Sequence, residues 1–550
     1  MDTLFDIMSS AWKKLYPDEE TSKLQQFIKE IEEYKAHLNI TANEPLWYKK
    51  TVVYSLYVDL FNKDFFGLED KLDYLQSLGI NCIWLLPVLD SPMKDAGFDV
   101  RNYQLIRKSL FGLPETAADE EAERLFANFL DKAHKRNIKI IFDIALNHCS
   151  NENQWFVKSK DDKSSPYRNY FIWNKDDKKY SQARLIFKGM CPSNWEKYND
   201  EYYFHRFFEF QPDFNYKNPD VLLQMVRIIL YWLKLGIDGF RADAIPYLWK
   251  EDNTNCENLE GTHTILKFIK AVLDYVKPNT LLLAEACQPP KEVVKYFGKA
   301  DECNAGYHFP LMPMIYKAIA MQSRMPIINI LDKNTTPEIS TDSQWFMFLR
   351  CHDELSLELV YVSEEDRKYI HDNYCHKPEW DFRLGEGISA RLSELMQFDY
   401  EKELLAYSVM LTLPGTPIIY YGDEFGKAND YDYYKEQVKF TGKDDTRFLV
   451  RGKIDWKNTE QQLSNSKSFN NKLFNGLKEM LNRRNQLDVF GTGTIEWVNT
   501  NNNAILSYYR TSNGRKVLII NNLSDKEQNI DIENVGNISL SRYAFQWIII

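Results

Sequence analysis

The chain has 550 residues, 44% of them hydrophobic and 27% charged, a composition typical of a globular protein. A chain of this length is longer than an ordinary domain with a single hydrophobic core, so we expect one large domain with smaller additions, or two to three domains. The net charge is −11, and no segment is dense enough in lysine and arginine to hold a polyanion, which argues against nucleic acid as a partner.

Several functional signals are missing from the sequence. The segment 1–16 has no uninterrupted apolar stretch of signal-peptide length, and no run of about 18 apolar residues occurs, so we expect a cytoplasmic protein without a membrane span. The eight cysteines are scattered without a CxxC pair, which favours buried free thiols in a reducing compartment. There is no Walker loop and no GxGxxG motif, so no nucleotide cofactor is expected.

The segment 1–46 is expected to form a helical extension. Between Leu24 and Leu38, apolar residues recur at steps of three and four, which predicts a helix with one apolar face. That face needs a surface to pack on, and the main body of the protein is the expected one. The extension and the C-terminal segment are also the surfaces on which we would expect a homo-oligomer to form, if there is one.

From Trp47 onward, short apolar runs alternate with helical periodicity, which indicates βα units around a parallel sheet. Eight such units would close into a (β/α)₈ barrel, expected over 47–148 and 211–485, with its active site at the C-terminal strand ends. A doubly wound open sheet is the alternative, but it usually places its ligand at one switch point. The strand-like runs are Val52–Val58, Asn81–Pro87, Lys139–Leu146, Gly236–Ala244, Thr280–Ala286, Tyr307–Pro310 (the weakest), Gln344–Cys351 and Pro417–Tyr421.

Two segments depart from this alternation. The segment 149–210 separates the third and fourth strand-like runs, and an insertion of this length is typical of a lid or small subdomain. Its many aromatic rings could stack on sugar faces or form a small core of their own. The segment 486–550 is expected to be a small β-sandwich domain, because Asn513-Gly514 joins two strand-like runs and is a strong hairpin signal.

Three of the predicted strands end in a carboxylate. Asp243 follows Arg241 at the fourth strand, Glu285 ends the fifth, and Asp353 follows the seventh. In a barrel these carboxylates would converge on one mouth, where repulsion would raise at least one pKa. Retaining glycoside hydrolysis needs one ionised and one protonated carboxyl, and Asp243 beside Arg241 suits the nucleophile while Glu285 between alanines suits the acid. The alternative at Arg241 and Asp243 is a purely structural ion pair.

The same strand ends resemble the α-amylase family, glycoside hydrolase family 13. This resemblance implies that Asp243 is the nucleophile, Glu285 the general acid/base and Asp353 the residue that grips the sugar hydroxyls in the transition state. It also implies a first sugar subsite lined by a wider set of residues. The matching motifs, in family order, are Asp143–His148, Gln211–Asn215, Gly239–Asp243, Leu283–Ala286, Phe348–Asp353 and Gly415–Glu424, and the implied subsite residues are Arg241, His148, His352, Asp99 and Tyr103.

Further segments are similar to one branch of the family, the trehalose synthases, which interconvert maltose and trehalose without releasing the transferred glucosyl unit. This similarity implies maltose or short α-glucosides as substrates and a closed pocket that excludes water. A hydrolase of the same family, an α-glucosidase or α-amylase, is the first alternative, and a non-catalytic carbohydrate-binding relative is the second. The segments are His205–Phe207, Asn253–Leu259, His308–Pro313 and Ala544–Trp547.

The chain also departs from that branch. Lys250 stands where the branch supplies a calcium-ligating glutamate, so the resemblance to calcium-free α-glucosidases implies an ammonium between Asn147 and Asp213 and no metal there. Cys351 replaces the usual asparagine before the His-Asp pair, and only Arg391 is kept from an arginine cluster of the family. These changes lie near the subsite expected to hold the acceptor sugar, so the choice between sugar and water as acceptor stays open.

Overall fold

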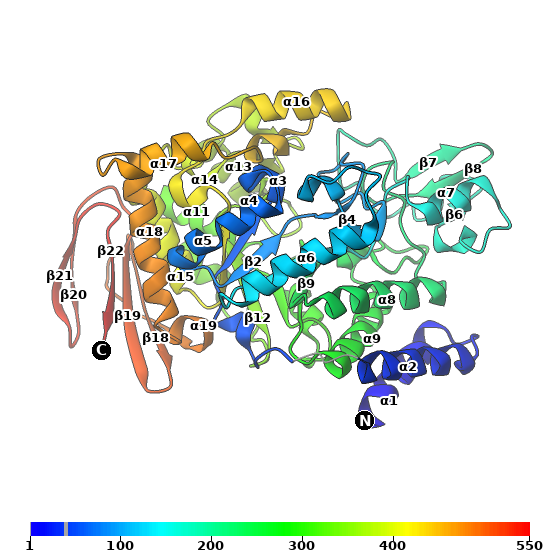
Figure 1. The fold of residues 1–550 in the computed structure, drawn as a ribbon. Coiled ribbons are helices and arrows are strands. Elements are labelled where there is room, and N and C mark those ends of the chain that lie inside the picture. The colour runs from blue at the N-terminus through cyan, green and yellow to red at the C-terminus, as the bar shows by residue number, and fades with distance from the viewer. Residues whose placement is uncertain (1, 38–41) are drawn as a thin grey trace.

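Eight parallel strands close into a barrel at the centre of the chain (Figure 1). The structure is a computed structural model that describes residues 2–37 and 42–550. The barrel order is β1-β16-β12-β11-β10-β9-β5-β2, so the expected (β/α)₈ barrel is confirmed and the open sheet is excluded. The strands are β1 (Val53–Leu56), β2 (Cys82–Leu85), β5 (Lys139–Ala145), β9 (Gly239–Asp243), β10 (Leu281–Ala284), β11 (Ala305–Tyr307), β12 (Gln344–Phe348) and β16 (Thr416–Tyr420).

The helices around the barrel begin and end at recognisable sequence signals. In α8 (Pro219–Leu235), the Asn218 side chain accepts from Asp220 N and Pro219 occupies the first turn. Gly236, with φ 113°, caps its C-terminus. The other helices of this region are α3 (Val58–Asn62), α4 (Phe65–Asp70), α5 (Leu72–Leu78), α6 (Asp119–His134), α9 (Glu260–Val276), α10 (Pro290–Val293), α11 (Leu311–Met321), α12 (Met325–Ile330), α13 (Glu364–Tyr374), α14 (Leu392–Leu395), α15 (Tyr400–Thr412), α16 (Tyr431–Thr441), α17 (Trp456–Ser464) and α18 (Phe469–Asn485).

Two strands differ in position from their sequence prediction. The run Gly236–Ala244 yields a strand only from Gly239, because Gly236 ends the preceding helix with a left-handed conformation. The weak run Tyr307–Pro310 is shifted, because β11 ends at Tyr307. His308 O already accepts the Leu311 amide, so the residues after Tyr307 lead into α11.

The N-terminal helices α1 (Asp2–Leu15) and α2 (Thr21–Ala36) lie against the outside of the barrel, beside α8 and α9 (Figure 1). The hydroxyl of Tyr16 donates to Tyr216 O at 2.9 Å, and Phe27 stacks on Phe268 with ring centroids 6.3 Å apart. The apolar face of α2 therefore packs on the barrel helices, while Leu38, the last residue of the predicted stripe, lies outside the described residues.

Two groups of short elements extend from the C-terminal side of the barrel strands. The inserted segment contains α7 (Gln154–Asp161) and a three-stranded sheet, and a second small sheet follows β12. The strands of these loops are β6 (Trp173–Asn174), β7 (Trp195–Tyr198) and β8 (Glu201–Phe204), then β13 (Leu355–Ser356), β14 (Asp381–Phe382) and β15 (Gly387–Ile388), and earlier in the chain β3 (Leu89–Asp90) pairs with β4 (Asn102–Ile106).

The C-terminal strands lie on the far side of the barrel from the inserted segment, next to α18 (Figure 1). The predicted hairpin forms, with Asn513 at φ 51° and Gly514 at φ 76° between its strands. Ser408 of α15 donates from Oγ to Asn521 Oδ1 at 2.7 Å and accepts from Trp547 Nε1 at 2.9 Å, which ties this part to a helix of the barrel. The elements are α19 (Val489–Thr492), β17 (Thr494–Trp497), β18 (Ile505–Ser512), β19 (Arg515–Asn522), β20 (Gln528–Ile532), β21 (Gly536–Leu540) and β22 (Phe545–Ile549).

None of the helices in the described part of the chain has the length and apolar character that a membrane span requires.

Candidate active site

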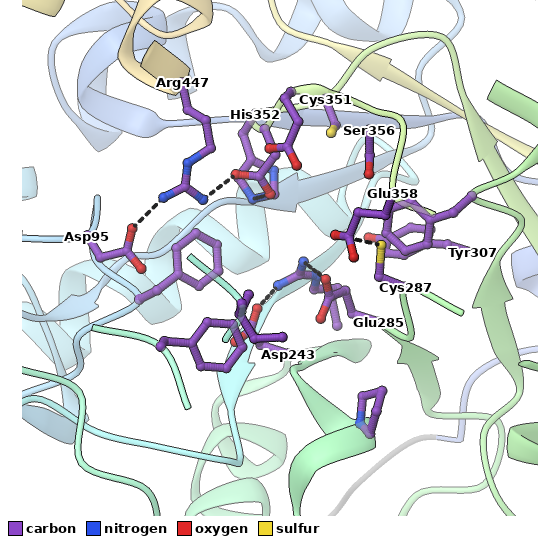
Figure 2. Close-up of a pocket in the computed structure, with 18 of the residues that line it drawn as sticks. Asp95, Asp243, Glu285, Cys287, Tyr307, Cys351, His352, Ser356, Glu358 and Arg447 are labelled. Atoms are coloured by element: carbon purple, nitrogen blue, oxygen red, sulfur yellow. Dashed lines mark hydrogen bonds and ion pairs between the residues drawn. The ribbon is translucent and has the colours of Figure 1, made fainter. Parts of the chain in front are cut away.

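A pocket opens at the C-terminal ends of the barrel strands, and three carboxylates that the sequence singled out line it. Figure 2 shows two of them, Asp243 and Glu285. Asp243 lies at the end of β9, Glu285 directly follows β10, and Asp353 lies in the loop after β12. The strand register explains their meeting, because Leu283 of β10 pairs with Arg241 of β9, which places the ends of the two strands side by side.

One buried guanidinium joins the carboxylates of neighbouring strands. Arg241 Nη1 lies 2.7 Å from Asp143 Oδ1 and also contacts Asp243, while Nη2 lies 3.5 Å from Glu285 Oε1. Because side chains alternate along a strand, Arg241 and Asp243 point to the same side of β9. The two candidate reacting carboxyls, Asp243 and Glu285, are thus each paired with one terminal nitrogen of the Arg241 guanidinium.

The electrostatics of this pair suit acid–base chemistry near neutral pH. Burial raises the pKa of Asp243 to about 7 against the opposing charge of Arg241, and burial likewise raises the pKa of Glu285 to about 7. Arg241 contacts Asp243 more closely than Glu285, which favours the ionised form of Asp243. The pair therefore shares a proton near pH 7, and the closer contact of Arg241 with Asp243 favours Glu285 as the group that carries it.

Asp353 has a different environment. Its Oδ1 accepts from Arg447 Nη1 at 3.1 Å and from Arg451 Nη2 at 3.2 Å, and its Oδ2 lies 3.1 Å from His352 Nε2. Burial opposes ionisation, but the positive charges around this carboxylate outweigh it and hold the pKa of Asp353 well below its usual range. An ionised carboxylate that stays ionised is suited to accepting sugar hydroxyls rather than to proton transfer.

Two histidines also line the pocket, as the resemblance implied. Burial lowers the pKa of both His148 and His352 to about 4, so both rings are neutral at pH 7. His352 stacks on Phe98 with ring centroids 5.4 Å apart, and His148 Nε2 lies 3.4 Å from Gln211 Nε2. A neutral imidazole can donate one hydrogen bond to a sugar hydroxyl without adding charge.

The structure corrects the placement of Asp99 and Tyr103. Asp99 is completely buried and accepts from Ser91 Oγ at 3.0 Å and from the amides of Lys94 and Asp95, so it shapes the loop instead of facing the pocket. Tyr103 donates its hydroxyl to the backbone carbonyls of Ala145, the last residue of β5, and of His148. Its phenol is therefore already engaged away from the sugar.

Asp95 and Phe98 line the pocket in their place, and sequence reasoning missed both. Arg447 connects Asp95 to Asp353, at 3.3 Å and 3.1 Å respectively. Acidic residues stand two positions on either side of Gly97, whose φ of 98° turns the chain sharply. The sequence signal was present, but only the direction of that turn decides which acid faces inward.

Arg391 is the third residue that the structure does not bring to the pocket. It is fully buried, donates from Nη1 to Asp423 Oδ1 at 3.0 Å, and lies over the ring of Tyr420 at 4.3 Å. The arginine that does line the pocket is Arg383, which donates from Nη2 to Glu358 Oε1 at 2.7 Å. It lies in the loop between β14 and β15, where no periodic pattern marks it.

Lys250 contacts the two residues, Asn147 and Asp213, between which the sequence suggested an ammonium in place of a metal. Its Nζ lies 2.8 Å from Asn147 Oδ1, 2.9 Å from Asp213 Oδ2 and 3.4 Å from Phe214 O. Lys250 is 3% exposed and Asp213 is completely buried. The ammonium therefore neutralises a carboxylate that has no access to solvent.

Replacing Lys250 with methionine is expected to lower the free energy of unfolding by about 3–5 kcal/mol, because it leaves Asp213 charged and unpaired in the interior. The matched control is Lys267→Met, which removes a half-exposed ion pair of 3.2 Å to Asp301 and should cost under about 1 kcal/mol. Urea unfolding followed by fluorescence measures both. Equal effects in the two variants would contradict the role given to Lys250.

Comparisons with known proteins agree with this geometry. The family model "Alpha amylase, catalytic domain" matches residues 41–374, and the model "Alpha-amylase SusG C-terminal domain" matches residues 505–546. The chain is 38% identical over 525 residues to the trehalose synthase/amylase TreS of Mycobacterium tuberculosis, covering 89% of this chain and 84% of that protein. It is 37% identical over 539 residues to a trehalose synthase of Pimelobacter sp., covering 90% and 91%.

More distant similarities are to proteins with other activities. An oligo-1,6-glucosidase of Parageobacillus thermoglucosidasius is 27% identical over 553 residues, covering 88% of this chain and 91% of that protein. Among solved structures, an α-amylase from H. orenii matches with a TM-score of 0.69 at 22% identity, covering 91% of this chain and 99% of that one. The structural match supports the fold alone.

Proposed function

Since the chain belongs to the α-amylase family of glycoside hydrolases, we propose that it is a trehalose-synthase-like enzyme that cleaves and re-forms the α-glucosidic bond of maltose or short α-glucosides. The observation that carries the proposal is the pair Asp243 and Glu285 on the two arms of Arg241, one favoured as ionised and the other as protonated. This is the pair that a retaining glucosyl transfer requires.

The proposed reaction has two steps. Asp243 attacks the anomeric carbon while the bond to the leaving oxygen breaks, and Glu285 gives its proton to that oxygen. The glucosyl unit is then covalently bound to Asp243. The released glucose turns within the pocket, so that a different hydroxyl group faces the anomeric carbon. Glu285 removes the proton of that hydroxyl as it attacks, which releases Asp243. Asp353 and the neutral histidines hold the glucosyl hydroxyls throughout.

A closed pocket is what makes transfer outcompete hydrolysis, because water must not reach the glucosyl-enzyme. Ion pairs between separate segments surround the pocket. Arg184 of the inserted segment lies 2.9 Å from Glu257 and 3.0 Å from Glu358, and Arg383 shares Glu358. Lys188 adds a pair to Glu386 at 2.7 Å. These contacts tie the insertion to the segment after β12 across the entrance and support retention of the freed glucose.

Proton NMR of the full chain incubated with maltose tests the proposal through the anomeric signals. Trehalose that accumulates with little free glucose is the expected result. Glucose as the sole product would mean that water is the acceptor and that the chain is a hydrolase of the same family. No change in maltose or in short α-glucosides would overturn the proposed function.

The pH dependence of kcat/KM should be a narrow bell centred near pH 7. Activity requires ionised Asp243, so it falls as the pH drops below the raised pKa of about 7, and it requires protonated Glu285, so it falls as the pH rises above a similar value. The two limbs report macroscopic values of the coupled pair. Rates on an activated α-glucoside between about pH 5 and 9 measure the profile, and a flat profile across that range would contradict it.

Replacing Arg383 with glutamine should increase the ratio of glucose to trehalose formed from maltose several-fold. Arg383 is almost completely buried, and its loss leaves Glu358 with Arg184 as its remaining ion-pair partner among the described residues, which loosens the entrance. The matched control is Arg227→Gln, which breaks the exposed pair with Glu30 far from the pocket. NMR product ratios should move in the first variant alone, and an unchanged ratio in Arg383→Gln would argue against water exclusion by this loop.

A further inference from the structure

Three consecutive residues after β12 place three different metal-binding atoms in the pocket. The Sγ of Cys351, a ring nitrogen of His352 and a carboxylate oxygen of Asp353 all lie within 4.8 Å of one another. All three side chains line the same cavity, and Figure 2 shows Cys351 beside His352. Cysteine, histidine and aspartate are ligands that Zn²⁺ accepts, and three protein ligands with one open position is a known zinc arrangement.

The proposed glucosyl transfer does not use all of these atoms. His352 is 2% exposed, yet neither of its ring nitrogens makes a hydrogen bond of acceptable geometry to any part of the chain that the structure describes. Both guanidinium hydrogen bonds to Asp353 end on Oδ1, so Oδ2 faces the imidazole. Cys351 brings a thiol to the same place, so a sulfur, an imidazole nitrogen and a carboxylate oxygen lie together in the pocket.

The charge of the pocket favours a cation. Six carboxylates line it against three guanidinium groups, so like charges repel one another in the pocket. A divalent ion would relieve that repulsion. The carboxylates are Asp95, Asp243, Glu285, Asp353, Glu354 and Glu358, and the guanidinium groups are Arg241, Arg383 and Arg447.

We propose that Cys351, His352 and Asp353 bind a thiophilic divalent cation of the Zn²⁺ class, and that the bound ion blocks the sugar pocket. As the metal–sulfur bond forms, the S–H bond of Cys351 breaks and its proton passes to solvent. His352 is already neutral and needs no proton loss. The three ligand atoms must approach one another by roughly 1 Å to reach zinc distances of about 2.0–2.3 Å, a shift that small side-chain rotations supply. Asp353 and His352 cannot bind the ion and hydrogen-bond the sugar hydroxyls at the same time, so binding of the metal and binding of the sugar are mutually exclusive.

The direct test is titration of the chelator-treated full chain with Co²⁺, followed by the near-ultraviolet sulfur-to-cobalt charge-transfer band, and then displacement of Co²⁺ by Zn²⁺. The expected result is a thiolate band in the wild type that is absent from Cys351→Ser and Cys351→Asn, with Co²⁺ bound roughly 100-fold more weakly. The matched control is Cys287→Ser. That thiol lines the same pocket but lies 3.7 Å from Glu358 and 3.6 Å from the Tyr361 hydroxyl.

Absence of the band in the wild type, its persistence in both Cys351 variants, or its loss in Cys287→Ser would overturn the proposal. A measurement on the wild type alone keeps the test valid if the Cys351 variants fail to fold. Zn²⁺ must protect Cys351, and not Cys287, from alkylation mapped by mass spectrometry, and equal or absent protection would count against the site. These readouts involve no sugar, so they stand if the proposed function fails, whereas inhibition of maltose turnover by Zn²⁺ rests on that function.

Discussion

Asp243→Asn is expected to lower turnover of maltose by roughly 10⁴-fold or more, because a carboxamide cannot form the glucosyl ester on which both steps depend. The substitution keeps the shape of the side chain, and Arg241 retains Asp143 at 2.7 Å and Glu285 at 3.5 Å. The fold should therefore persist while the chemistry is lost. NMR product formation measures the effect, with circular dichroism to check the fold.

A matched control separates the chemistry from general damage. Asp301→Asn removes a half-exposed carboxylate that pairs with Lys267 on the surface, and it should leave turnover within about twofold of the wild type. A second variant, Asp243→Ala, creates space for azide. With α-glucosyl fluoride as the donor it should yield a β-glucosyl azide, because one displacement inverts the anomeric carbon. Near-normal turnover by Asp243→Asn, or α-azide from Asp243→Ala, would remove Asp243 from the role of nucleophile.

Glu285→Gln is expected to separate substrates by their leaving groups. Maltose needs a proton on the departing oxygen, so its turnover should fall by about 10²–10⁴-fold. The leaving group of a 4-nitrophenyl α-glucoside, 4-nitrophenolate, is a stable anion that needs no proton, so this substrate should keep most of its rate for the first step. The basic limb of the pH profile should also disappear, because a carboxamide does not titrate near pH 7. Single-turnover release of 4-nitrophenol beside NMR on maltose measures the difference.

Glu354 provides a demanding comparison for Glu285. It lines the same pocket, and burial raises its pKa to about 7 as well, so its ionisation alone would make it a rival acid. It lies 3.9 Å from Arg383 and outside the Arg241 contacts that hold the reacting pair. Glu354→Gln should therefore affect both substrates alike. A leaving-group dependence in Glu354→Gln, and none in Glu285→Gln, would reassign the acid.

Periodic patterns determined the barrel and the positions of its carboxylates. Strand and helix periods are local properties, so alternation from Trp47 onward specified βα units, and closure of eight parallel strands follows from their number. Because parallel strands end at one face, Asp243, Glu285 and Asp353 had to meet there, and the pocket is lined by all three. The terminal hairpin at Asn513-Gly514 was equally local.

Tertiary structure alone decided which loop residues reach the pocket. Asp95 and Asp99 flank the same glycine, and the turn at Gly97 directs the first inward while backbone amides capture the second. Arg383 and Arg391 lie in one segment, yet only Arg383 finds carboxylates across the pocket entrance. A loop side chain is oriented by partners distant in the sequence, such as Glu358 or Asp423, and no local period encodes their positions.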